Sequence, residues 1–225
     1  MIKGLYPDFM QWSDGGSIYL YSDPHFGDAD SYRQRSLLSN SLTGEMLKNK
    51  LDLLDKMQID NINKIVRKSD TLIILGDIGD IEKVRELKAG RKIALLGNHD
   101  KGKTNYEAPG LFDNVYAGVL TIAENIMLSH EPVDFRFCFN IHGHDHNGTE
   151  FKRYVLRDYD ADMPMADMRK NYLATIKKYG LTKLNLCAEW IGYLPINLKD
   201  VIQAGVLSRI PSVHQDYIDK HNGRK

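Results

Sequence analysis

The sequence lacks an excess of charge of either sign, since 30 Lys and Arg residues balance 30 Asp and Glu residues in a chain of 225. A basic nucleic-acid coat protein or an acidic tail would show an imbalance, because attraction to phosphate and self-repulsion both scale with net charge. The content of 42% hydrophobic and 27% charged residues is that of an ordinary globular protein. The composition therefore argues against both of those classes.

Long apolar runs and paired cysteines are also lacking. No stretch approaches the roughly 18 apolar residues that a membrane-spanning helix needs, and the first residues, MIKGLYPDFMQWSDGG, lack the apolar core of a signal peptide. Cys138 and Cys187 lie in apolar segments, far apart and without neighbouring histidines, which predicts reduced core residues rather than a zinc knuckle or a redox motif. We therefore expect a cytoplasmic protein that does not bind membranes.

A linker between domains is absent as well. No Pro/Gly/Ser-rich stretch, low-complexity tract or internal repeat occurs, which predicts a single domain over residues 1–225. Two segments have the character of insertions: the polar residues 27–44, and residues 149–183, which include the charged run EFKRYVLRDYDAD. Either could form loops over a site, because functional loops are commonly mounted on a rigid scaffold. The alternative, to which we give equal weight, is that both segments are solvated surface without a functional role.

What is present is an alternation of short apolar runs with helical patterns, which predicts an α/β fold. Buried strands are expected at residues 17–21, 71–75, 92–96, 125–128 and 137–141. Helices are expected around residues 47–66, 81–87 and 165–179. Alternation in the first hundred residues favours parallel βαβ units, while the close succession of strands from Val119 onward favours antiparallel pairing. The sequence thus predicts a mixed sheet, or two packed sheets, flanked by helices.

Side chains that can bind metal follow every one of these apolar runs. They are Asp23 and His25; Asp77 and Asp80; Asn98, His99 and Asp100; His130; and His142, His144, Asp145 and His146. Each motif alone is more often a turn, a helix cap or a half-buried histidine. Together the motifs place six of the 8 histidines at five successive strand ends, which chance does not readily explain. Because the carboxyl ends of parallel strands converge on one edge of a sheet, we expect these side chains to meet there.

The ordered set of motifs resembles the calcineurin-like metallophosphoesterase superfamily, whose pattern reads D-x-H, G-D-x-x-D, G-N-H-[DE], H and G-H-x-H. In this chain the five blocks stand as Asp23-x-His25, Gly76-Asp77-x-x-Asp80, Gly97-Asn98-His99-Asp100, His130 and Gly143-His144-x-His146. The resemblance covers residues 17–146, and more loosely residues 185–198, which look like the closing strand of small bacterial and phage members. It implies a four-layer sandwich, with two mixed β-sheets packed together and flanked by helices.

The resemblance also implies a centre of two divalent cations bridged by Asp77. Asp23, His25 and His146 would complete the first position, and Asn98, His130 and His144 the second. The carboxylate has two oxygens and can bridge, whereas an imidazole offers one nitrogen at a time. Gly143 would permit a turn at the entry to the last motif. Manganese is favoured by the resemblance, and the ligand set also suits iron, zinc, nickel or cobalt.

The remaining motif residues are expected to support this centre. By resemblance, His99 would contact the phosphate and protonate or stabilise the leaving oxygen, with Asp100 orienting its ring. We expect Asp80 to cap the following helix or to hydrogen-bond a ligand, and His142 and Asp145 to have supporting or structural roles. His214 and His221 lie in a polar stretch and are expected to be exposed.

The function implied is a phosphoesterase that attacks phosphate esters in line with a metal-bound hydroxide, with diesters favoured over monoesters. Its partner would be a phosphate-ester substrate, and nucleotides or nucleic acids belong to that class. A metal-dependent nuclease or RNA-processing enzyme of the same fold is the alternative, for which a basic strip could serve: Arg169, Lys170, Lys177, Lys178 and Lys183. These side chains more often mark the wet face of a helix.

Three further readings fit the residues less well. A metallo-β-lactamase-like hydrolase has an H-x-H-x-D-H cluster, but the run from His142 to His146 is one residue too short for it. A protein serine/threonine phosphatase would carry Asp-Arg-Gly in the second block, where this chain has Asp80 followed by Ile81 and Glu82. A non-catalytic scaffold would be expected to have lost ligands, and every ligand-type residue is present.

Overall fold

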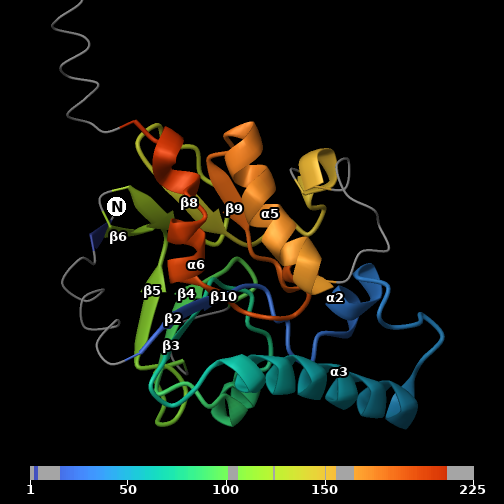
Figure 1. Ribbon diagram of the computed structural model, residues 1–225. Helices are drawn as coiled ribbons and strands as arrows, with labels where there is room; N and C mark the ends of the chain where they lie inside the picture. Colours follow the sequence, from blue (N-terminus) through green and yellow to red (C-terminus); the bar gives the residue numbers. More distant parts are fainter. Residues whose placement is uncertain are drawn as a thin grey trace, which may run out of the picture.

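The computed structural model describes residues 3–4, 16–100, 106–123, 125–149, 151–155 and 165–211. Two five-stranded sheets form the framework (Figure 1). The first has the strand order β10-β2-β3-β4-β5. Its strands are β2 (Ile18–Tyr21), β3 (Thr71–Ile74), β4 (Arg91–Leu96), β5 (Asn114–Ala117) and β10 (Ile196–Asn197). The four strands β2 to β5 pair in parallel, which confirms the predicted parallel arrangement of the first hundred residues, and β10 is antiparallel to β2.

The second sheet has the order β1-β6-β7-β8-β9. Its strands are β1 (Lys3–Gly4), β6 (Leu120–Ala123), β7 (Ile126–Leu128), β8 (Phe139–His142) and β9 (Lys183–Asn185). The β6–β7 pair is antiparallel, as expected for closely spaced strands, but β7, β8 and β9 run parallel. The prediction of antiparallel pairing thus holds for one pair in this sheet. A loop between β7 and β8 and a helix between β8 and β9 provide the crossovers that parallel pairing requires.

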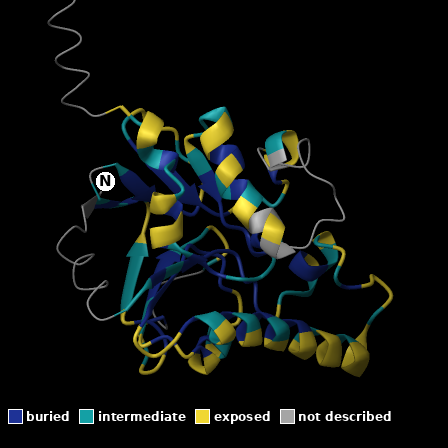
Figure 2. Cartoon of the chain, in the orientation of Figure 1, coloured by how far each residue is buried: buried dark blue, intermediate teal, exposed yellow. Residues whose placement is uncertain are grey.

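Helices cover the sheets. They are α2 (Ala29–Gln34), α3 (Gly44–Ile65), α5 (Met165–Tyr179) and α6 (Leu198–Gln203), with short 3-10 helices η1 (Ile81–Glu86), η3 (Ala188–Ile191) and η4 (Val206–Arg209) and a π turn η2 (Phe151–Val155). The long helix α3 buries Leu54, Ile59 and Ile62, and its Gln58 accepts a hydrogen bond from the Tyr21 hydroxyl of β2 at 2.6 Å. Its opposite face is exposed (Figure 2). The apolar periodicity of this segment therefore predicted the helix and its buried side.

One apolar core contains side chains from both sheets. The strands β3, β7 and β8 are buried along their whole length. Apolar side chains on both faces of a strand require a covered layer on either side. The fold is therefore an α/β arrangement of two mixed sheets flanked by helices, as the sequence predicted. No helix in the described part of the chain is long and apolar enough to cross a membrane.

Part of the second predicted insertion belongs to this framework. Helix α5 contributes Tyr172 and Ile176 to the core, and the Tyr172 hydroxyl accepts a hydrogen bond from the backbone N–H of Asn185 in β9 at 3.0 Å. The spacing of these two residues by four places them on one helix face. The charged run that precedes them is what gave the segment the character of an insertion.

The expected closing strand is also divided. Residues 185–198 contain the end of β9, the 3-10 helix η3 and the strand β10, so the segment serves both sheets in turn. Gly192 and Tyr193 have φ values of +66° and +57°, and this turn breaks the segment. His214 and His221 lie outside the described residues.

Candidate metal centre

The predicted ligands meet at the carboxyl ends of five strands. Backbone hydrogen bonds continue past the ends of the strands and join the segments that contain the motifs. Asp23 N–H donates to Gly76 O at 3.1 Å, and His25 N–H donates to Asp77 O at 3.0 Å. On the other sheet Gly143 N–H donates to His130 O at 2.9 Å. Residues separated by more than a hundred positions in sequence therefore lie side by side at one edge of the fold.

Four of the seven predicted ligands have a left-handed backbone. The φ values are +55° for Asp23, +47° for His25, +51° for Asp77 and +65° for His144. For a residue other than glycine this conformation is uncommon and costs of order 1 kcal/mol or more. Such outliers gather where a structure fixes side chains for a task, so this edge is a candidate functional site on backbone geometry alone.

Two motif glycines allow the chain segments to approach closely. A Cβ atom on Gly97 would collide with the Asp77 carboxylate and would lie 2.6 Å from the Asp77 backbone nitrogen. A Cβ atom on Gly143 would collide with the side chains of Ser22 and Asp23. Gly143 was expected to provide a turn, and its φ is not in the left-handed range. Its role is to leave room for Asp23.

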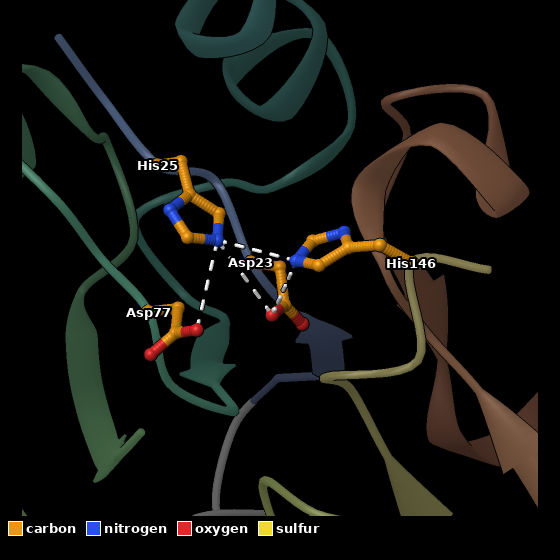
Figure 3. A group of neighbouring side chains, drawn as sticks. All are labelled: Asp23, His25, Asp77 and His146. Atoms are coloured by element: carbon orange, nitrogen blue, oxygen red, sulfur yellow. Dashed lines mark hydrogen bonds and ion pairs between the residues drawn. The ribbon is translucent and has the colours of Figure 1, made fainter. Parts of the chain in front are cut away.

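The first group of side chains consists of Asp23, His25, Asp77 and His146, whose potential ligand atoms lie within 4.8 Å of one another. His25 Nε2 is 3.6 Å from Asp77 Oδ2 and 3.3 Å from His146 Nε2. His146 Nε2 is 3.4 Å from Asp23 Oδ1. Figure 3 shows both rings pointing toward the Asp23 carboxylate, with Asp77 facing His25. The four side chains surround a common point at which a cation could be held.

The second group consists of Asp77, His130 and His144, again within 4.8 Å. His130 Nε2 is 3.3 Å from Asp77 Oδ2 and 2.8 Å from Asn98 Oδ1. His144 Nδ1 is 3.1 Å from the same Asn98 oxygen. Asp77 belongs to both groups. The structure thus brings together all seven predicted metal ligands in the two sets that the sequence predicted.

The two carboxylates of these groups, Asp23 and Asp77, are both buried. Asp23 is fully buried, and its Oδ1 has no hydrogen-bond partner among the described residues. Burial opposes ionisation of Asp23, but contacts with His146 and His130 outweigh it, so the pKa of this carboxyl lies well below its usual range. Asp77 also has a lowered pKa, because His130 offsets the cost of burial. Both carboxylates are therefore ionised at neutral pH.

The histidines respond in opposite directions. Burial lowers the pKa of His130 and His146, but the neighbouring carboxylates raise it by more than burial lowers it. The result is a pKa of about 9 for each. The partners that raise it are Asp77 and Asp23 for His130, and Asp23 and Glu189 for His146. The pKa of His25 is lowered by burial and by the charge of Arg35. The charges of the two carboxylates are thus offset by two protonated imidazoles at neutral pH.

His99 and Asp100 lie beside these groups, but Asp100 does not orient the His99 ring as predicted. Its carboxylate accepts hydrogen bonds from the backbone N–H groups of Asp77 at 2.9 Å, Ile78 at 3.0 Å and Gly97 at 2.7 Å. Three N–H donors satisfy a carboxylate well, so Asp100 fixes the two loops that carry Asp77 and Asn98. The exposed His99 ring lies edge-on to the His25 ring, with 5.5 Å between centroids.

The three predicted supporting residues have structural roles. Asp80 caps η1 by accepting from Glu82 N–H at 3.1 Å. Asp145 accepts from Thr149 N–H at 2.9 Å and so closes the turn after the last motif. His142 is buried, pairs through Nδ1 with Gly143 O at 2.7 Å, and has a pKa lowered to about 4 chiefly by burial. None of the three belongs to the two groups described above.

Sequence reasoning missed two charged residues next to the first group. Glu189 Oε1 is 2.7 Å from His146 Nδ1, and Glu189 Oε2 is 3.4 Å from Arg35 Nε. Arg35 Nη2 donates to Asp23 O at 2.8 Å. Arg35 comes from the polar segment 27–44 and Glu189 from the segment that matches the resemblance only loosely, so no motif spacing marked either residue. Together they connect the first insertion to two of the predicted ligands.

Cys187 also lies next to His146 and Glu189, and the potential ligand atoms of the three side chains are within 4.8 Å of one another. Its thiol contacts Asp23 Oδ2 at 3.4 Å, and burial raises its pKa well above the ordinary value. A thiol must lose its proton to bind metal, so Cys187 is a buried neutral residue at neutral pH. Cys138 is buried and reduced as well, which confirms the prediction for both.

Within the predicted basic strip, the side chain of Arg169 lies outside the described residues. Lys170, Lys177 and Lys178 are exposed on α5, as expected for the wet face of a helix. Lys183 pairs with Asp134 at 2.8 Å.

Comparison with known proteins shows the fold and nothing of the function. No protein-family model matches the sequence, and no curated protein matches it. A crystal structure of the protein of unknown function AQ665 from Aquifex aeolicus is similar, with a TM-score of 0.52 and 21% sequence identity. The match covers 84% of this chain and 98% of that protein. The two-sheet architecture is therefore shared with a known structure.

Proposed function

We propose that this protein is a phosphoesterase of the calcineurin-like metallophosphoesterase type, which hydrolyses phosphate esters with two divalent cations and favours diesters over monoesters. The observation that carries the proposal is the position of Asp77 in two ligand groups at once. Two cations that share a carboxylate form the kind of centre that clamps a phosphate in an in-line displacement. The two mixed sheets agree with the four-layer sandwich that such enzymes have.

The residues present fit two cations. The buried Asp23 Oδ1 has no hydrogen-bond partner in the described part of the chain, which a cation would correct. Asp23, His25, Asp77 and His146 would hold one ion, and Asp77, Asn98, His130 and His144 the other. Imidazole, carboxylate and amide donors without a thiolate suit manganese, our favoured ion, and also iron, zinc, nickel or cobalt.

The protein side chains have separate tasks in this proposal. When bound, the cations would supply positive charge to the phosphate and lower the pKa of water toward neutrality. The exposed ring of His99, beside His25, is free to contact the ester and to donate a proton to the leaving oxygen. Asp100 holds the loops of Asp77 and Asn98 in register through backbone hydrogen bonds. A cytoplasmic location is part of the proposal, because both cysteines are free.

The test is hydrolysis of bis(4-nitrophenyl) phosphate and of 4-nitrophenyl phosphate by chelated and by manganese-loaded protein. We expect activity only with metal, and a higher kcat/KM for the diester. Asp77→Asn should lose both metal and activity, whereas His99→Ala should keep the metal and lose rate, because only Asp77 is assigned to hold metal. Full activity of the chelated protein, or of both variants, would overturn the proposal.

The matched control is Asp60→Asn, which removes an exposed carboxylate that pairs with Lys56 on α3 at 2.8 Å. It should leave metal content and rate unchanged. If it behaves like Asp77→Asn, the losses come from a general effect of removing acidic charge, and the assignment of Asp77 fails.

A further inference from the structure

A cavity of about 540 Å³ opens beside the metal centre at His146. Its wall is formed by α2 and the residues that follow it, and by the turn around η3. The charged and aromatic side chains in this wall are Arg35, His146, Lys152, Glu189 and Trp190. A volume of this size lies in the range that small-molecule sites have, roughly 300 to 1,000 Å³. The cavity is thus large enough for part of a substrate.

Arg35 brings a buried positive charge to this cavity. Its side chain is 3% exposed, and its Nη2 donates to Asp23 O at 2.8 Å. Its Nη1 is buried and makes no hydrogen bond of good geometry within the described residues, although the guanidinium also interacts with the Tyr193 hydroxyl. A buried donor without a partner is uncommon, because loss of its hydration is not compensated. An acceptor in the cavity would supply the missing bond.

Lys152 adds a second positive charge. Its Nζ lies over the Trp190 ring, 5.3 Å from the centroid, and the residue is exposed. The one carboxylate in the wall, Glu189, is shared between His146 Nδ1 and Arg35 Nε, so its charge is already offset. Lys152 has no such acidic partner in the wall. The cavity therefore carries an excess of positive charge before any cation is bound at the centre.

We propose that this cavity binds an anionic group, a phosphate, phosphonate or carboxylate, carried by the part of the ester that is not displaced. Arg35 and Lys152 would hold this group while the scissile phosphate lies at the metal centre, which His146 links to the cavity. The inference rests on the proposed phosphoesterase function and adds the substrate class, an ester with a second negative charge. It also gives residues 27–44 a role in recognition.

The test compares two ligands that differ in the second anionic group, propyl phosphate and 3-phosphonopropyl phosphate. Isothermal titration calorimetry on the manganese-loaded and on the chelated protein gives their dissociation constants. Charge-assisted hydrogen bonds should make the second ligand bind about tenfold more tightly. Lys152→Met should remove most of that ratio, and Arg35→Lys should lower it. Equal affinities in the unaltered protein, or an unchanged ratio in Lys152→Met, would overturn the inference.

The matched control is Lys56→Met, which removes an exposed lysine on α3 and should keep the tenfold ratio. Hydrolysis of the 4-nitrophenyl esters of the two ligands separates this inference from the proposed function. The doubly charged ester should show a lower KM with a similar kcat. If neither ester is hydrolysed but the affinity ratio holds, the proposed function fails and the anion site stands. If both esters are hydrolysed with equal KM, the anion site fails and the function stands.

Discussion

Glu189 Oε1 lies 2.7 Å from Nδ1 of His146, whose Nε2 faces Asp23. A carboxylate on the far nitrogen of a ligating histidine fixes the tautomer and the direction of the ring. In the proposed centre Glu189 would therefore be a positioning residue for the first group of side chains, although it belongs to none of the motifs.

Glu189→Gln should weaken manganese binding by about tenfold, and Glu189→Ala by more, because the amide can still accept a hydrogen bond from His146 while alanine cannot. Competition with a chelator of known affinity measures this without reference to activity. Glu82→Gln is the control, since Glu82 is exposed and pairs with Arg85. Unchanged affinity in Glu189→Ala would show that His146 needs no support from this side.

Metal binding should release protons. His130 and His146 have a pKa of about 9 in the metal-free protein, so both are largely protonated at pH 8, and a cation needs the neutral imidazole. We expect about two protons released per protein at pH 8, fewer as the pH rises through 9, and almost none near pH 10. Calorimetric titration in buffers of different ionisation enthalpy gives this number. Release of no proton at pH 8 would contradict the assignment of these two ligands.

Gly97→Ala should disturb the centre through contact alone, because its Cβ would collide with the Asp77 carboxylate. We expect a loss of metal content together with about 1–3 kcal/mol of stability. Gly118→Ala is an informative control, since Gly118 has a φ of +86° and a Cβ added there would meet no atom within 4 Å. It should cost about 1 kcal/mol through backbone strain and keep the metal. Full metal content in Gly97→Ala would mean that Asp77 is not held where the structure has it.

His142 should make the metal-free protein sensitive to acid. Its pKa is about 4 in the folded state and about 6.5 when unfolded, so between these values the unfolded chain binds the additional proton. The free energy of unfolding should fall by about 3 kcal/mol from this group as the pH drops from 6.5 to 4. Urea unfolding of chelated protein at several pH values measures the slope, which should be shallower in His142→Gln. Equal slopes would place the acid sensitivity elsewhere.

The sequence was most informative where function and fold coincide in short motifs. Asp77 and His130 each come soon after a buried apolar strand, so the strand pattern and the motif pattern supported each other, and the gathering of the seven side chains at one edge could be predicted. Asp100 could not be assigned correctly, because its partners are backbone N–H groups of distant loops, and every residue except proline carries one. Spacing alone does not reveal such partners.

Contacts between residues distant in sequence and connections between strands limited the prediction of the other site residues and of the sheet topology. Glu189 meets Arg35 across more than 150 positions, and neither residue type is unusual on a protein surface. The parallel pairing of β7 with β8 arises through a loop without a helix, which the spacing of strands does not distinguish from an antiparallel connection. Helix α5 was included in an insertion because the charged run before it outweighed the apolar spacing of Tyr172 and Ile176.

If the proposed centre holds two cations, the presence of Asp77 in both groups of side chains would make the two positions thermodynamically dependent on each other. A cation at one position changes the charge and the freedom of the carboxylate that the other must use. Linkage then requires that each position alter the affinity of the other by the same factor. Titration with metal should accordingly follow a cooperative curve, positive or negative, rather than the sum of two independent sites.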